Sequence, residues 1–127
     1  DETLRIAEAA DALADYMLFV DEAAIPSPIE GSSGFAEKFS ARGKLYELDL
    51  KRRLLKYPCS YLIYSPAFDA LPPLAKVPIY RRMWHVLAGE AGEARYRSLS
   101  LADRQAVVEI LKDTKRDLPA YFTAVTK

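Results

Sequence analysis

The residues best suited to chemistry lie between Leu48 and Glu90. This stretch holds the only Cys (Cys59), the only Trp (Trp84), the only His (His85) and four of the eight Tyr in a chain of 127 residues. A thiol and an imidazole are the minimum for a cysteine nucleophile with its base, and a carboxylate beside them would complete a metal site. No C-x-x-C, H-E-x-x-H or H-x-x-x-H spacing supports either chemistry. The sequence therefore assigns no catalytic residue, no metal ligand and no cofactor.

Cys59 and His85 each have a simpler structural interpretation. Cys59 stands in the most apolar run of the chain, CSYLIYSPAF, and cysteine is among the most buried residue types, so we expect it in the core. His85 follows Trp84 on a helix whose apolar face other residues already define, so we expect a surface or boundary histidine. Carboxylates are numerous, but none are paired in apolar surroundings that would raise a pKa.

An aromatic and arginine group is the best candidate for binding. Tyr, Trp and Arg are enriched at binding hot spots, and three tyrosines follow one another at i, i+4 and i+7, so one helix would present all three. The candidate binding residues are Tyr57, Tyr61, Tyr64, Arg81, Arg82, Trp84 and His85, with Tyr80 in the same group. The alternative is a boundary layer, in which each tyrosine ring points inward and its hydroxyl points to solvent.

Composition and charge narrow the class of protein. Half of the residues are hydrophobic and 28% are charged, which is ordinary for one globular domain over residues 1–127. Lys and Arg balance Asp and Glu at 18 each, which argues against nucleic acid as a partner and against a polybasic membrane contact. The apolar runs are too short for a transmembrane segment. A net charge of zero disfavours solubility in isolation and suggests a domain that sits beside something larger.

Apolar periodicity and proline spacing predict an all-α fold. Helices are expected over residues 3–21, 35–42, 45–57 and 101–117, with a proline-initiated helix from Pro72 or Pro73 to Gly89. Ser65-Pro66 is expected to start a further helix. The apolar stripes expected to face the core are Leu13, Met17 and Val20 in the first helix, Leu50, Leu54 and Tyr57 in the third, and Val77, Tyr80, Trp84 and Leu87 in the proline-initiated helix. The predicted caps are Thr3, Ser33, Ser65 and Ser100. Residues 23–34, AAIPSPIEGSSG, form a predicted loop.

The run CSYLIYSPAF has residue types that favour a strand. A short buried helix is preferred because the chain offers it no partner strand. We expect Leu118, Tyr121 and Phe122 to pack back on the body. The predicted architecture is a compact, irregular domain of five or six helices with Pro-based turns.

A basic cluster, Lys51, Arg52, Arg53 and Lys56, lies on the polar side of the helix expected at 45–57. A solvated helix face is the usual role of such a run. The alternative is an anion site, although no Gly-rich phosphate loop accompanies the cluster.

The C-terminal run YRSLSLADRQAVVEILKDTKRDLPAYF resembles the closing helix of c-type cytochrome domains. Those helices open with a Leu-Ser pair, continue through a few polar residues and become apolar. The haem-attachment motif C-x-x-C-H is absent, because Cys59 is followed by SYLIY. The resemblance therefore implies no covalent haem.

Four runs, SGFAEKF, LDLKRRLLKYPCSYLIYSPAFDALP, YRRMWHVLAGE and SLADRQAVVEILKDTK, are similar to the C-terminal region of uncharacterised, exported bacterial proteins. That likeness covers most of the chain and brings no known activity. It implies a C-terminal fragment of a longer protein, located in the periplasm or outside the cell. A start at Asp1 inside a helical pattern, with no signal peptide, agrees with this interpretation.

The expected function is that of a non-catalytic domain in a larger bacterial envelope protein. It would pack on or bind the rest of the parent polypeptide, or bind a protein partner. Two alternatives stay open. His85, Cys59 and the arginines would contribute to an enzyme or redox site completed by an N-terminal part, or an aromatic-lined pocket would hold a small ligand.

Overall fold

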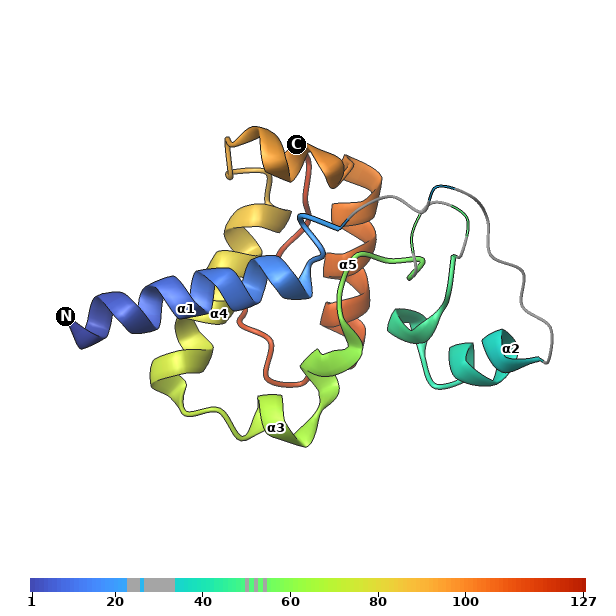
Figure 1. The fold of residues 1–127 in the computed structure, drawn as a ribbon, viewed down its shortest axis with the longest axis horizontal. Coiled ribbons are helices and arrows are strands. Elements are labelled where there is room, and N and C mark those ends of the chain that lie inside the picture. The colour runs from blue at the N-terminus through green and yellow to red at the C-terminus, as the bar shows by residue number, and fades with distance from the viewer. Residues whose placement is uncertain (23–25, 27–33, 50, 52, 54) are drawn as a thin grey trace.

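Five α-helices and three short 3-10 helices make up the described part of the chain (Figure 1). The computed structural model describes residues 1–22, 26, 34–49, 51, 53 and 55–127. The α-helices are α1 (Glu2–Met17), α2 (Phe35–Ser40), α3 (Pro66–Asp69), α4 (Pro73–Leu87) and α5 (Leu101–Thr114), and the 3-10 helices span Lys44–Tyr46, Tyr61–Tyr64 and Ala94–Ser98. These residues contain no sheet, so the predicted all-α class is confirmed.

The body of the fold is built on the contact between α1 and α4, which cross in Figure 1. Ala10, Ala14 and Met17, at i, i+4 and i+7, form the buried face of α1. Small side chains let two helix axes approach closely, because little stands between the backbones. Leu13, which the periodicity placed on the buried face, lies on the flank and is 38% exposed. The contact between α1 and α4 is therefore formed by alanines of α1 and not by the leucine that the sequence suggested.

The ends of α1 differ from the prediction. Asp1, and not Thr3, caps the helix, because the Asp1 carboxylate accepts a hydrogen bond from the Thr3 backbone N–H at 3.1 Å. The helix ends at Met17, four residues before the expected end. Phe19 causes this early stop, since its φ of 55° turns the chain out of the right-handed helix.

Proline and serine start the helices in the middle of the chain as predicted. The Ser65 hydroxyl accepts from the Phe68 N–H at 3.1 Å, and Pro66 is the first residue of α3. Proline fits that position because the first helical N–H has no partner inside the helix. The next helix, α4, starts at Pro73, also as predicted, and runs through Pro78.

The buried face of α4 overlaps the predicted one, since Tyr80 and Leu87 are buried as expected, but it is rotated toward Ile79. Its buried residues are Ile79, Tyr80, Met83, Val86 and Leu87. Val77 was expected among them but is 53% exposed. The first turns of α4 reach beyond the part of the helix that α1 covers, so an apolar residue there remains at the surface.

The described residues between 45 and 57 do not form the predicted helix, so that prediction is wrong for them. Leu48 and Leu55 form an antiparallel bridge, and the Lys56 N–H donates to the Glu47 carbonyl at 2.8 Å. Arg53 supports the turn, because its guanidinium donates to the carbonyls of Leu55 and Lys56. These bonds occupy carbonyls that a helix would use itself. Of the predicted apolar stripe, Leu50 and Leu54 lie outside the described residues, as does Arg52 of the basic cluster.

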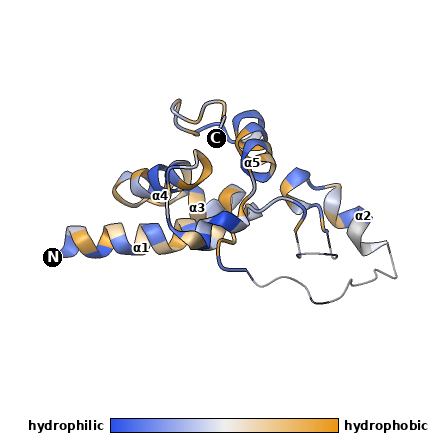
Figure 2. Ribbon diagram, turned by 90° about the horizontal axis from the view of Figure 1, so that it is seen from above, coloured by the Kyte–Doolittle hydropathy of each residue, from blue (hydrophilic) through white to orange (hydrophobic). Residues whose placement is uncertain are grey.

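The segment from residue 34 to residue 57, which we call the arm, carries α2 and the 3-10 helix Lys44–Tyr46. Its helix α2 stands apart from α1, α4 and α5 in both ribbon views (Figure 1, Figure 2). Aromatic rings attach the arm to the body: Tyr46 stacks on Tyr61 with 4.6 Å between ring centroids, and Phe39 meets Tyr61 edge-on at 5.5 Å. The expected loop at 23–34 and its cap Ser33 lie outside the described residues, except for Pro26 and Gly34.

The C-terminal third closes the core as predicted. The Ser100 hydroxyl caps α5 by accepting from the Asp103 N–H at 3.1 Å, and Val107 and Leu111 are fully buried. Beyond α5, Phe122 is buried between Tyr80 and Trp84, with ring centroids at 6.0 and 5.3 Å. The tail therefore covers one side of α4, which leaves α1 to cover another.

Gly89 ends α4 in a left-handed conformation, with φ of 80°. The N–H groups of Gly89 and Glu90 donate back to the carbonyls of Val86 and His85, which is the Schellman arrangement for a helix C-terminus. A Cβ atom added at Gly89 would collide with the Lys127 carbonyl oxygen and the Arg104 guanidinium. Both the backbone conformation and the close approach therefore require glycine.

Replacing Gly89 by Ala should lower the free energy of unfolding by about 2 kcal/mol, because a left-handed alanine is strained and its Cβ displaces the tail. Chemical denaturation measures the loss. Gly92→Ala is the matched control, since nothing lies within 4 Å of its Cβ position and no left-handed backbone is imposed there. Equal stability of the two variants would contradict this account.

Candidate functional site

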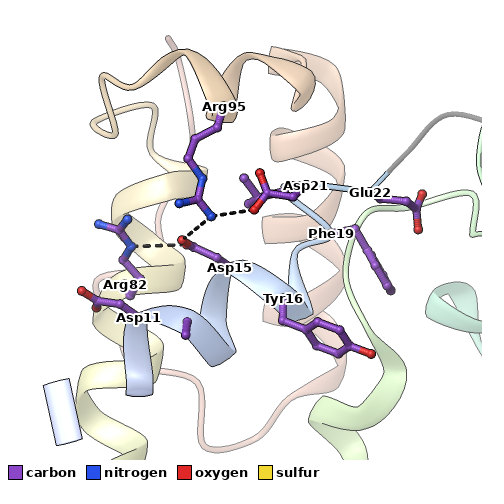
Figure 3. Close-up of a pocket in the computed structure, with 10 residues that line it drawn as sticks. Asp11, Asp15, Tyr16, Phe19, Asp21, Glu22, Arg82 and Arg95 are labelled. Atoms are coloured by element: carbon purple, nitrogen blue, oxygen red, sulfur yellow. Dashed lines mark hydrogen bonds and ion pairs between the residues drawn. The ribbon is translucent and has the colours of Figure 1, made fainter. Parts of the chain in front are cut away.

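A pocket of about 730 Å³ opens at the C-terminal end of α1 (Figure 3). It lies where α1 meets α4 and the 3-10 helix Ala94–Ser98. Its lining comprises Asp11, Ala12, Asp15, Tyr16, Phe19, Val20, Asp21, Glu22, Arg82 and Arg95. Four carboxylates, two guanidinium groups and two aromatic rings thus converge on one open hollow, which we call the α1 pocket.

Phe19 occupies a position where a helix usually has glycine. The N–H groups of Phe19 and Val20 donate to the carbonyls of Tyr16 and Asp15, at 3.0 and 3.1 Å. Phe19 is therefore the left-handed residue of a Schellman motif, with φ of 55°. A bulky residue in this region costs about 1–2 kcal/mol relative to the right-handed conformation. The motif directs the Phe19 ring away from the body, beside Tyr16, which is 67% exposed.

The charged wall of the pocket is organised around Asp15, which is 7% exposed. Its carboxylate accepts from Arg82 Nε at 3.3 Å and from the Tyr96 hydroxyl at 2.8 Å, and Arg95 Nη2 lies 3.3 Å away. Arg95 also donates to the exposed Asp21 at 2.7 Å. Two hydrogen-bond donors and one further cation, from two other elements, thus surround the buried carboxylate on α1, and the network has a fixed geometry.

These contacts shift the pKa values of the groups around Asp15. Burial raises the pKa of the Tyr96 phenol, and the hydrogen bond to the negative Asp15 raises it further. Burial works against the charge of Arg82, but the hydrogen bond and charge of Asp15 outweigh it and raise the pKa of the guanidinium. Asp15 therefore keeps both partners protonated.

Two other carboxylates of the α1 pocket have no such partner. The side-chain carboxylates of Asp11 and Glu22 make no hydrogen bond or ion pair with any residue that the structure describes, and both residues are exposed. Partial burial raises the pKa of Glu22, which the positive charge of Arg53 opposes. Surplus negative charge next to two aromatic rings suits a cation, since both carboxylates and ring faces attract one.

The predicted binding residues are spread over several separate places. Tyr61 and Tyr64 belong to the stack with Tyr46 that attaches the arm. On the exposed side of α4, the Arg81 guanidinium lies 5.7 Å from the Tyr121 ring centroid, and Trp84 is next to the same ring at 6.4 Å.

The remaining predicted residues do not complete a single site either. Of the predicted binding residues, Arg82 is the one that lines the α1 pocket. Tyr57 precedes the 3-10 helix that carries Tyr61 and Tyr64, and its ring lies 5.5 Å from Lys56 Nζ. His85 Nδ1 lies 3.5 Å from Glu90 Oε2 at the end of α4. The expected presentation of three tyrosines by one helix is thus wrong, because residues 57–64 do not form one continuous helix.

Sequence reasoning missed Asp15, Tyr16 and Phe19 as site residues. Asp15 stands between Leu13 and Met17 of the predicted buried stripe of α1, two residues from each, so the helical period placed its carboxylate off the buried face. Tyr16 and Phe19 share neither spacing nor motif with the arginines on α4. Only the fold brings Arg82 and Arg95 to the end of α1.

A second polar cluster joins α3, α4 and the residues after α5. Asp117 accepts from Lys76 Nζ at 3.0 Å and from the Tyr80 hydroxyl at 2.9 Å. Burial raises the pKa of Asp117, but these hydrogen bonds and the neighbouring Lys115 lower it more, so the net shift is downward. Lys115 is buried and pairs with Asp69. Every charged group named here already has a partner, so the cluster is suited to holding elements together.

Cys59 lies in the core as predicted. Its side chain is fully buried, and this burial raises the pKa of the thiol to about 12. The predicted surface or boundary position of His85 is also confirmed, and no hydrogen bond joins the two residues. Within the described residues no group of His, Cys, Asp or Glu is arranged to hold a metal ion. None of the helices there has the length and apolar character needed to span a membrane.

Comparison of the chain with family models, with curated proteins and with solved structures finds no match.

Replacing Asp15 by Asn should lower the free energy of unfolding by about 3 kcal/mol, because Arg82 and Tyr96 lose a shared buried acceptor of negative charge. Asp21→Asn is the control, since that carboxylate is 68% exposed and its pair with Arg95 is worth less than about 1 kcal/mol. Urea denaturation of both variants measures the difference, and a loss in Asp21→Asn as large as that in Asp15→Asn would contradict the assignment.

The Cys59 thiol should resist modification in the folded protein. A buried thiol with a raised pKa is hardly ever a thiolate near pH 8, and the thiolate is the reactive form. We expect no labelling by Ellman's reagent at pH 8 in native buffer, and one thiol per chain after unfolding in guanidinium chloride. Rapid labelling of the native protein would show that Cys59 is accessible.

Proposed function

We propose that this chain is a non-catalytic helical domain that binds a cationic segment of a protein in the α1 pocket. The segment would belong to the rest of a larger bacterial envelope protein or to a partner of that protein. The location in the periplasm or outside the cell, which the resemblance of the sequence implies, is part of the same proposal.

The observation that carries the proposal is the left-handed conformation of Phe19. Glycine at this position would complete the same turn without strain. Phe19 pays about 1–2 kcal/mol in backbone energy, yet its ring lines an open pocket and does not fill the core. Strained residues with side chains directed into a cleft are concentrated at binding and catalytic sites.

The chemistry of the lining supports a positively charged ligand. Arg82 and Arg95 are already bound to Asp15 and Asp21, whereas Asp11 and Glu22 remain available to a ligand. An Arg or Lys side chain between these carboxylates and the rings of Tyr16 and Phe19 would gain ion-pair and cation–π energy together. A protein segment suits the pocket because the lining residues Asp11 and Tyr16 on α1 are exposed to solvent.

The position of the thiol supports a role without catalysis. Cys59 would have to leave the core to act as a nucleophile, and its raised pKa keeps the thiol protonated. The alternative in which Cys59 and His85 complete an enzyme site therefore receives no support from their positions.

A blocked tetra-arginine peptide tests the proposal, with a blocked tetra-glutamate peptide as the control for ligand charge. We expect saturable shifts of the Tyr16 and Phe19 NMR signals with tetra-arginine alone. Phe19→Gly should weaken tetra-arginine binding about five- to tenfold, because one ring of the cation site is lost. The free energy of unfolding of Phe19→Gly should stay within about 1 kcal/mol of that of the unmodified chain, which we call the parent, since relief of backbone strain offsets the lost ring contacts.

The matched control is Leu74→Ala, which removes a 69% exposed apolar side chain from α4, outside the pocket. It should leave tetra-arginine binding unchanged. Binding that is equal in Phe19→Gly and the parent, or absent in the parent, would refute the proposed function.

A further inference from the structure

The charges of this neutral chain are separated along the sequence. Residues 1–22 contain seven Asp or Glu and one Arg, whereas residues 34–57, the arm, contain seven Lys or Arg and three Asp or Glu. The acidic segment is α1 with the rim of the α1 pocket. The molecule thus presents an acidic hollow and a basic projection within one chain.

The cations of the arm are available for a second molecule. Lys38, Lys44 and Lys51 are exposed, and their side chains make no ion pair or hydrogen bond with any described residue. Arg42 is exposed too, and its guanidinium lies 4.7 Å from the centroid of the Tyr46 ring of the same arm. Helix α2, which carries Lys38, stands clear of the three long helices in both ribbon views (Figure 1, Figure 2).

The base of the arm lies close to the rim of the α1 pocket. Arg53 of the arm acts on the pKa of Glu22 of the pocket within one chain. Arg53 is itself committed, since it forms a bidentate pair with Asp103 at 3.0 and 3.1 Å. A two-fold axis beside this junction would therefore bring each arm onto the pocket of the other copy, and both contacts would form at once.

We infer that the cationic segment bound by the α1 pocket is the arm of a second copy of this chain, so that two copies pair through reciprocal pocket and arm contacts. This inference rests on the proposed function, because it uses the same pocket and names its occupant. Lys38 and Lys44 supply the cations, and Asp11 and Glu22 receive them. Complementary charge patches of this kind speed association and set its register, and salt weakens them.

Sedimentation velocity of the purified chain, over a range of concentrations at low salt, tests the inference. The parent should shift from monomer to dimer as its concentration rises, and 1 M NaCl should return it to monomer, because the screening length falls to about 3 Å. The pocket variant Asp11→Lys with Glu22→Lys and the arm variant Lys38→Glu with Lys44→Glu should each raise the dimer dissociation constant at least tenfold.

A one-to-one mixture of the two variants should dimerise again, because each reversed surface then meets a reversed partner. The control is Glu93→Lys with Glu109→Lys, which changes net charge as the pocket variant does but at exposed residues outside both surfaces. It should dimerise like the parent. Loss of pairing in this control, or no recovery in the mixture, would overturn the inference.

A second readout separates this inference from the proposed function. If the parent stays monomeric while tetra-arginine still binds the pocket, the pocket holds a segment of another protein and only the self-pairing is refuted. If the parent is monomeric and tetra-arginine does not bind, both proposals fail. If the parent dimerises and tetra-arginine competes with dimer formation, both are supported.

Discussion

The buried carboxylate of Asp15 holds together three parts of the chain that are far apart in sequence. It lies on α1, Arg82 comes from α4, and Tyr96 comes from the 3-10 helix Ala94–Ser98. A charge with so little exposure is tolerated only when its oxygens are fully hydrogen-bonded. The position of each donor is therefore fixed, and the pocket formed by the same three elements inherits that fixed shape. Close packing of α1 on α4 through Ala10 and Ala14 permits these contacts, since longer side chains would separate the helices.

Local chemistry made much of the fold predictable. Ser65, Pro66 and Ser100 start their helices for reasons that act within four residues, so the sequence suffices to place them. Burial of Cys59 and Phe122 followed from apolar runs in the same way. The prediction of a helix at 45–57 was wrong because Leu48 pairs with Leu55 and the Arg53 guanidinium donates to a backbone carbonyl, and both contacts stabilise a non-helical backbone. Neither contact has a periodic signal in the sequence.

The candidate site was much less predictable than the fold. Arg82 and Tyr96, which donate to Asp15, are 67 and 81 residues from it in sequence, and no spacing rule connects residues over that range. Residue types drew attention to Arg82, which lines the pocket, but also grouped it with Arg81, which lies beside Tyr121. The left-handed Phe19 was not predictable at all, because helix C-termini of this kind are recognised by glycine. Its strain becomes visible only in the backbone angles.

The attachment of the arm has a consequence for how the molecule opens. Stacked rings of Tyr46 and Tyr61, the buried Leu45 side chain and the Arg53–Asp103 pair connect the arm to the body. Most residues of the core come instead from α1, α4 and α5. Segments with few buried apolar contacts detach at a free energy well below that of global unfolding. We therefore expect the arm to open as a separate cooperative unit, with amide hydrogens that exchange with solvent before those of α4. The loss of ring stacking would mark that detachment optically while the helical body stays intact.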